Sequence, residues 1–276
     1  MRAVVLAGLL ALAWPAAAQA VDYGGGQAPP SAKRAHRDVA LVTLRAPGNG
    51  RVTVRAAVAA PCGVGKIRRT LTPGADGSFR FAATVRTRTS APGVRQTSRM
   101  TVAGRVAGSA ASGTATAKVR FRRHGRIVAR CSSGTDNWQA RAAVAGTTPA
   151  PPRALGAYYG TTSQGPRAIV VRTAGNARRV ATAVFQYRMT CRNRVFDGEN
   201  ITPGGAIAAD GTFHLRERFA LRFAEGNERY RVAVDGRFTA TGVSGTLSVR
   251  SVFKRRGDGR VRDRCTTGAT IFAAAL

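Results

Sequence analysis

The chain has 276 residues, and its 44 lysines and arginines against 13 aspartates and glutamates give a formal net charge of +31 at pH 7. This length is enough for two domains of ordinary size, and a charge this far from zero attracts polyanions without specifying a fold. Beyond the first 20 residues no apolar run is long enough to cross a bilayer, which excludes a transmembrane helix in the remainder of the chain.

Residues 1–20 are predicted to be a secretory signal peptide. Arg2 precedes an apolar run from Ala3 to Trp14, and Ala18-Gln19-Ala20 has the small-x-small pattern of a cleavage site. A transmembrane anchor is the alternative, but the apolar run is shorter than the roughly 20 residues that span a bilayer. We therefore expect a secreted, extracellular protein with no transmembrane segment after cleavage.

Residues 21–37 contain Gly24-Gly25-Gly26 and Pro29-Pro30 with little apolar content, which predicts a disordered lead-in. From residue 38 to residue 145 apolar and polar side chains alternate, as between Val52 and Ala60 or between Phe79 and Val85. Alternation with a period of two indicates half-buried strands. Asp76-Gly77 is a hairpin signal between two of them. These residues are predicted to form a first β domain.

The second half repeats the first. In order, the first copy reads Val102-Ala103-Gly104-Arg105, Ser112-Gly113-Thr114, Phe121, Cys131, Gly134 and Trp138. The second reads Val234-Asp235-Gly236-Arg237, Ser244-Gly245-Thr246, Phe253, Cys265, Gly268 and Phe272. Repetition in the same order indicates a duplicated structural unit. Residues 146–155 are a proline-rich linker, and residues 156–276 are predicted to form the second β domain.

No segment after the leader has sustained helical periodicity, so both domains are expected to be all-β. Short loops between successive strands favour antiparallel meanders closed, or nearly closed, into barrels. A β-sandwich is the alternative, although Greek-key sandwiches need long crossovers that this chain lacks.

Four cysteines in a chain addressed to an oxidising compartment predict two disulfides. Of the three possible pairings, the duplication favours Cys62–Cys131 and Cys191–Cys265, because a repeated unit should close its own bridge. Zinc is the alternative, but no Cys-x-x-Cys spacing is present and the three histidines do not accompany the cysteines. We expect neither a metal nor a cofactor.

The two copies fill their interiors differently. Where the second domain has Ala183, Phe185, Tyr187 and Met189, the first has Val54, Ala56, Val58 and Ala60, and Val85 stands at the Phe219 position. Each buried phenylalanine or leucine stabilises a fold by roughly 1.5–3 kcal/mol against exposure. The first domain is therefore predicted to be less stable, or to contain a cavity.

The order Ser-Gly-Thr, basic hairpin, Cys-[Ser/Thr]-[Ser/Thr]-Gly and closing aromatic resembles tandem domains of secreted proteins from GC-rich, actinobacterial-type Gram-positive bacteria. The resemblance covers residues 38–145 and 156–276 and implies no known activity. Tyr159-Gly160-Thr161-Thr162 also resembles the start of such a domain. The first domain shows no matching segment ahead of its first expected strand.

The sequence predicts a protein that is not an enzyme. The first domain has few carboxylates, and no nucleophile elbow, His-Glu-x-x-His pair or phosphate loop is present. Ser112-Gly113-Thr114 and Ser244-Gly245-Thr246 recur in both copies, which favours a structural turn or bulge over active serines. One anomaly is Glu217, which falls on an apolar strand face where the first domain has Ala83.

A carboxylate inside a barrel could contact a cationic or hydroxylated ligand, or act as a base with raised pKa. Glu217 with Phe185 and Tyr187 thus defines an alternative function, a small-ligand carrier using the interior of the second domain. Pairing of Glu217 with an arginine, or a bulge that turns it outward, is the simpler explanation.

Basic residues are the remaining signal, because strand parity places many of them on one outer face of each domain. These residues are Arg80, Arg86, Arg88, Arg99, Arg105, Lys118, Arg120 and Arg122 in the first domain, and Arg216, Arg218, Arg222, Arg231, Arg237 and Arg250 in the second. Arginine suits phosphate, sulfate and carboxylate, whereas base stacking needs interleaved aromatic residues that these faces lack. We expect loose binding of anionic polymers at or outside the cell envelope, without specific nucleic-acid recognition. A merely solvated basic face is the alternative.

Overall fold

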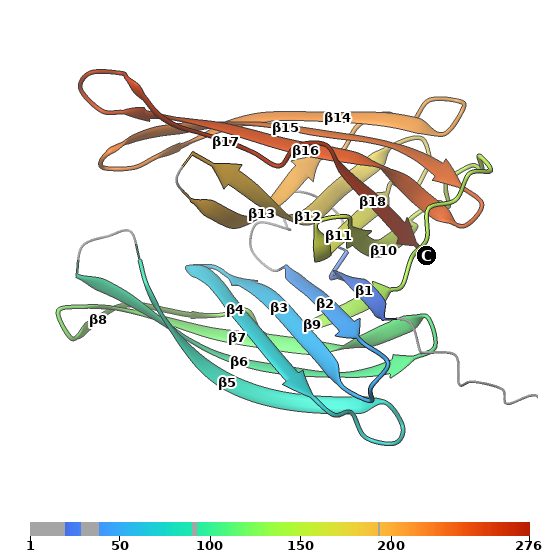
Figure 1. Cartoon of the computed structure of the whole chain (residues 1–276), viewed down its shortest axis with the longest axis horizontal. Helices are drawn as coiled ribbons and strands as arrows, with labels where there is room; N and C mark the ends of the chain where they lie inside the picture. Colours follow the sequence, from blue (N-terminus) through green and yellow to red (C-terminus); the bar gives the residue numbers. More distant parts are fainter. Residues whose placement is uncertain (1–19, 29–38, 90–92, 193) are drawn as a thin grey trace, which may run out of the picture.

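A computed structural model describes residues 20–28, 39–89, 93–192 and 194–276, and consists of two nine-stranded antiparallel sheets, one in each half of the chain. Figure 1 shows two curved sheets that meet where β1 (Val21–Gly26) and β2 (Ala40–Ala46) of the first lie against β10 (Ala157–Thr162) and β11 (Gly165–Thr173) of the second. The expected all-β, duplicated, barrel-like fold is confirmed. Among the described residues, no helix is long and apolar enough to span a membrane.

The strands of the first half are β1 (Val21–Gly26), β2 (Ala40–Ala46), β3 (Val52–Ala60), β4 (Gly63–Leu71), β5 (Ser78–Arg88), β6 (Val94–Ala107), β7 (Ala110–Arg123), β8 (Arg126–Ser132) and β9 (Asp136–Arg141). Those of the second half are β10 (Ala157–Thr162), β11 (Gly165–Thr173), β12 (Val180–Cys191), β13 (Val195–Pro203), β14 (Thr212–Arg222), β15 (Gly226–Thr239), β16 (Gly242–Arg255), β17 (Val261–Thr266) and β18 (Thr270–Ala275).

Both sheets have the same strand order. The first is β4-β3-β2-β1-β9-β7-β6-β5, and the second is β13-β12-β11-β10-β18-β16-β15-β14. The long strand β7 pairs with β9 along its first part and with β8 along its second part, and β16 does the same with β18 and β17. In the first half, β4 and β5 are the end strands of this path, so a seam runs between them.

The two halves differ in how they close. In the second half β17 also pairs with β12, where Cys191 is opposite Cys265, so the sheet closes on itself. In the first half the described ladder pairs β8 with β7 alone, and the Cys62–Cys131 disulfide joins β8 to the turn between β3 and β4. The disulfides are Cys62–Cys131 and Cys191–Cys265, as the duplication predicts.

The prediction of a disordered lead-in is wrong for Val21–Gly26. These residues form β1, which lies between β2 and β9, so the first domain begins before residue 38. The three glycines reflect close packing: a Cβ atom on Gly24 would lie 2.0 Å from the carbonyl oxygen of Gly160 in the other half. β1 is therefore the counterpart of β10. Residues 29–38 and most of the predicted signal peptide lie outside the described residues.

The proline-rich linker is bound to the second domain. The backbone N–H of Ala150 donates to the carbonyl oxygen of Phe238, and the N–H of Ala240 donates to that of Thr148. Because both partners belong to β15 or to the turn after it, part of the linker runs along the second sheet.

Several repeated residues have the same structural role in both copies. Asn49 and Asn176 each accept a hydrogen bond from the backbone N–H two residues later, and so do Asp76 and Asp210. Such bonds are the usual device of Asn and Asp in turns. In the Cys-[Ser/Thr]-[Ser/Thr]-Gly motif, hydroxyl oxygens accept from the glycine N–H and from a strand N–H in each half. These motif residues therefore have a structural role.

The Ser-Gly-Thr motifs do not form the expected turn or bulge. Gly113 lies within β7, opposite Gly104 of β6 and Trp138 of β9, and Gly245 has the same position in β16. A Cβ on Gly113 would lie 2.7 Å from the Trp138 ring. Glycine is required at both positions because a Cβ would lie 2.0 Å from a backbone oxygen of the neighbouring strand, that of Ala103 for Gly113 and that of Asp235 for Gly245.

The halves share a buried apolar interface. Val39 and Leu41 pack against Tyr159, Ala168, Val170 and Val184 in one cluster. Two polar contacts add to it: the Lys66 amine lies 2.9 Å from the Glu199 carboxylate, and Arg172 donates to the carbonyl oxygen of Ala28 at 2.7 Å. This packing holds β1 and β2 of the first half against β10 and β11 of the second.

Candidate functional site

The outer face of β5, β6 and β7 has a regular grid of cations. Arg95 lies opposite both Arg88 and Arg122, and Thr97 lies opposite both Arg86 and Arg120. Further along the strands, Arg99 lies between Thr84 and Lys118, and Arg130 of β8 extends the row of Arg120. The grid arises because alternate residues of a strand share a face, and the apolar alternates of these strands fill the core.

This face is hollowed. A groove of about 820 Å³ is lined by Arg86, Thr87, Arg88, Gly93, Arg95, Thr97, Arg120, Arg122, His124 and Gly125; we call it the arginine groove. A second hollow of about 610 Å³ shares Thr97 and Arg120 with it and adds Arg99, Lys118 and Arg130. The two hollows are adjacent on this face, because Thr97 and Arg120 line both. Neither has a carboxylate among its lining residues.

The charge of the arginine groove is uncompensated. Across the described part of the chain, none of its arginines forms an ion pair with a carboxylate, and Arg122 reaches only the carbonyl oxygen of Gly125 at 3.4 Å. Like charges directly opposite each other on neighbouring strands destabilise a sheet. A bound polyanion would remove that repulsion. The arrangement is thus suited to bind oxyanions.

The structure brings together six of the basic residues selected from the sequence: Arg86, Arg88, Arg99, Lys118, Arg120 and Arg122 line the two hollows. Arg80 lies further along β5, opposite Ala103, and Arg105 donates to the carbonyl oxygen of Asp76. Sequence reasoning missed Arg95, Arg130 and His124. Parity along β6 could have identified Arg95, whereas placing Arg130 needed the register of β8 against β7.

The corresponding face of the second domain is less uniform. Arg231 lies between Arg218 and Arg250, which reproduces one cationic row. Asp235, however, is bound by Arg216 and by His214, both at 2.7 Å. Arg237 is 2.8 Å from Asp210, and Arg222 lies opposite the neutral Asn227. Acids neutralise part of this face, whereas Ala103 stands at the Asp235 position in the first domain.

The interior of the second domain contains the predicted alternative site. Phe185 is fully buried and Tyr187 nearly so, while Glu217 is half-buried and accepts a hydrogen bond from Asn200 at 3.0 Å. Glu217 therefore points inward, bound by an amide rather than by the expected arginine. Burial, together with nearby Glu199, raises the pKa of the Tyr187 phenol far above its usual value. Large aromatic side chains fill the surrounding core.

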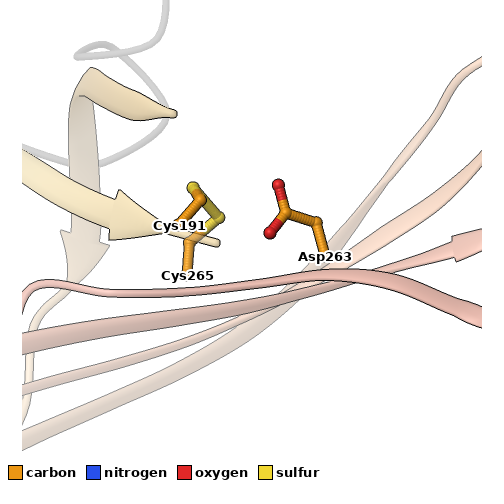
Figure 2. A group of neighbouring side chains, drawn as sticks. All are labelled: Cys191, Asp263 and Cys265. Carbon is orange, nitrogen blue, oxygen red and sulfur yellow. A yellow bond between two sulfur atoms is a disulfide. The ribbon is translucent and has the colours of Figure 1, made fainter. Parts of the chain in front are cut away.

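One group of side chains in the second domain has the composition of a metal site. Figure 2 shows Asp263 beside Cys191 and Cys265, whose sulfur atoms are bonded to each other. A disulfide offers no thiolate ligand. The Asp263 carboxylate accepts a hydrogen bond from the backbone N–H of Arg192 and lies 3.4 Å from the Arg194 guanidinium. The disulfide and the Asp263 contacts therefore have a structural role: they hold the end of β12 and the residues after it against β17.

No protein family and no curated protein matches the chain. Among solved structures, a protein provisionally assigned as an AttH from Nitrosomonas europaea is 11% identical, with a TM-score of 0.22, over 93% of this chain and 92% of that one. Kievitone hydratase from Nectria haematococca is 8% identical, with a TM-score of 0.18, over 93% of this chain and 89% of that one. At TM-scores this low, neither likeness bears on the fold or the function of this chain.

Proposed function

We propose that this protein is secreted and binds anionic polymers at or outside the cell envelope, through the arginine groove and the hollow beside it. The observation that carries the proposal is a groove of about 820 Å³ lined by five arginines and no carboxylate. The two disulfides support an oxidising compartment.

The groove is better suited to a polymer than to one small ion. Its cations form several rows along three strands, and strands lie about 4.8 Å apart, so charges repeat in two directions. A chain of phosphates, sulfates or carboxylates could contact several rows at once. The lining has no Phe, Tyr or Trp for base stacking, which supports charge-based binding without sequence reading.

The residues that line the arginine groove are better suited to binding an anion than to catalysis. Guanidinium groups stay protonated and donate hydrogen bonds but accept none. His124 is the one lining residue that is not an arginine, a threonine or a glycine, and it lies in a hairpin turn with φ of 47°. The groove can stabilise negative charge, and we assign it no proton transfer.

The test is binding to heparin, a teichoic-acid-like polymer and duplex DNA as a function of salt. A charge-based site should bind all three with little discrimination, and log affinity should fall linearly with log salt. Replacing Arg86, Arg88, Arg120 and Arg122 by Ser should weaken binding and, on DNA, reduce the salt slope by about 3–4, since each lost phosphate contact contributes about 0.9.

A matched control removes four charges elsewhere. Arg153, Arg178, Arg179 and Arg192 are exposed and lie outside the arginine groove. Their combined replacement by Ser changes the net charge equally and should leave most of the affinity and the slope intact. Equal losses in both quadruple variants would show that overall charge, and not this groove, binds the polymer.

A further inference from the structure

A third cavity lies between the two halves and shares no residue with the arginine groove or with the hollow beside it. This interdomain cleft, of about 520 Å³, is lined from the first half by residues of β3, β4 and β5, and from the second half by residues of β11, β12 and β13. Six of its lining residues are cations: Arg55, Lys66, Arg68, Arg69, Arg167 and Arg188. Only Asp197 and Glu199 oppose them.

Both acids of the interdomain cleft are already occupied. The Asp197 carboxylate lies 2.8 Å from Arg167 and 2.9 Å from Arg188, and Glu199 is bound by Lys66 at 2.9 Å. Among the described residues this leaves Arg55, Arg68 and Arg69 without a carboxylate partner. The cleft therefore has an excess of positive charge that its own acids do not neutralise.

Arg55 is the most exceptional of these residues. It lies directly opposite Arg68 in the ladder between β3 and β4, so two guanidinium groups are neighbours. Its Nε is buried and has no hydrogen-bond partner within the described ranges. Burial, and after it the Arg68 charge, lowers the pKa of Arg55. A buried donor without an acceptor is costly, and an oxyanion in the cleft would supply that acceptor.

Part of the lining of the interdomain cleft, away from the charged residues just described, is apolar. Ala56, Ile67, Ala83 and Val85 line it on either side of the seam between β4 and β5. At three of these positions the second domain has larger side chains, Phe185 for Ala56, Glu217 for Ala83 and Phe219 for Val85. The smaller residues of the first domain thus contribute to the open space of the cleft at its seam.

We propose that the interdomain cleft binds a small amphipathic anion, a carboxylate or phosphate on a short apolar chain. Arg55 and Arg68 bind the head group, and the apolar chain lies along Ala56, Ala83 and Val85 at the seam. Arg167 and Arg188 stay paired with Asp197 and form the rim on the side of the second half.

Calorimetric titration of the full chain with octanoate, octyl phosphate and inorganic phosphate tests this. Both octyl compounds should bind at least tenfold more tightly than inorganic phosphate, and the stronger of the two identifies the head group. Arg55→Gln should weaken binding of that compound at least tenfold. Val85→Phe, which installs the side chain of the second domain, should do the same by filling the apolar part of the cleft.

The matched control is Arg51→Gln, an exposed arginine just before β3 that lies outside the interdomain cleft and should leave affinity unchanged. The quadruple groove variant should also bind octyl anions normally, which separates this site from the polymer site. Unchanged affinity in folded Arg55→Gln and Val85→Phe proteins, or equal affinity for inorganic phosphate, would overturn the proposal.

Discussion

Arg95 on β6 lies directly opposite Arg88 on β5, so two guanidinium groups face solvent from adjacent strands. Arg122 on β7 is opposite Arg95 on its other side, which makes a row of three like charges with no carboxylate among the lining residues. Sheets ordinarily place opposite charges across strands. The repulsion here is a property of the free protein that a polyanion would remove, and it can be measured.

Replacing the central arginine of this row should stabilise the free protein. Arg95→Thr removes the central charge, and with it the repulsion from Arg88 and from Arg122. It also introduces a side chain that favours strands. We expect the free energy of unfolding to rise by about 0.5 kcal/mol at low salt, within the usual range for cross-strand pairs. The gain should shrink as salt screens the charges. Chemical denaturation at low and high sodium chloride measures both effects.

Arg80→Thr is the control, because Arg80 lies opposite Ala103 and has no cation directly across the strand. Its free energy of unfolding should depend little on salt relative to the parent. If Arg95→Thr destabilised the protein at low salt, the row would be held by contacts other than those described here.

The two disulfides should differ in their contribution to stability, although they close loops of similar length, with sequence separations of 69 and 74. Chain entropy predicts roughly 4 kcal/mol for either bridge. After Cys191→Ser with Cys265→Ser, β17 still pairs with β12 and β16. After Cys62→Ser with Cys131→Ser, the described ladder leaves β8 paired with β7 alone, so we expect the larger loss of stability here.

Trp138 provides the readout, because the other of the two tryptophans, Trp14, lies in the predicted signal peptide. Trp138 is 1% exposed in the core of the first domain, so its fluorescence reports unfolding of that half, while circular dichroism reports both. Equal destabilisation by the two double variants would show that strand pairing around the second disulfide contributes nothing beyond the bridge itself.

Asp197 should stabilise the protein in a pH-dependent way. The hydrogen bond from Arg188 lowers the pKa of the Asp197 carboxyl from 3.8 to about 2. Partial burial opposes this shift, and Arg167 adds to it. Because the pKa is lower in the folded state than in the unfolded chain, the Asp197 carboxylate stabilises the folded state at pH values above its ordinary pKa. This stabilisation is lost as the pH falls from about 4 to about 2. Because the side chain is 55% exposed, we expect no more than about 1 kcal/mol.

Asp197→Asn should therefore lower the free energy of unfolding at pH 7 and have a much smaller effect near pH 2. Asp258→Asn is the comparison, since Asp258 lies in an exposed hairpin with Arg255 at 4.0 Å. Its effect should be small at both pH values. An Asp197→Asn defect that persisted undiminished at low pH would mean that the amide disturbs packing and not charge.

The duplication made much of the fold readable from the sequence. Repeated Asn, Asp and Cys residues mark the same turns and bridges in both copies, because local hydrogen bonds and covalent bonds depend on residue type and spacing. Alternation likewise assigned Arg86, Arg88, Arg120 and Arg122 to one outer face, since side chains of a strand point to opposite sides in turn. The prediction of disorder from composition was wrong for Val21–Gly26, because its glycines allow close packing of neighbouring strands.

Only the tertiary structure decided where these residues meet. The sequence indicates a basic hairpin between β7 and β8 but not its register, which shifts between Phe121 and Arg122, so it could not place Arg130 beside Arg120. Nor does it show that the outer face of β3 meets the second half, where Arg55 lies near Arg167 and Arg188 in the interdomain cleft. The physical reason is that parity fixes the face of a strand, whereas the neighbours of that face depend on long-range pairing and on how two packed sheets bury their shared apolar surface.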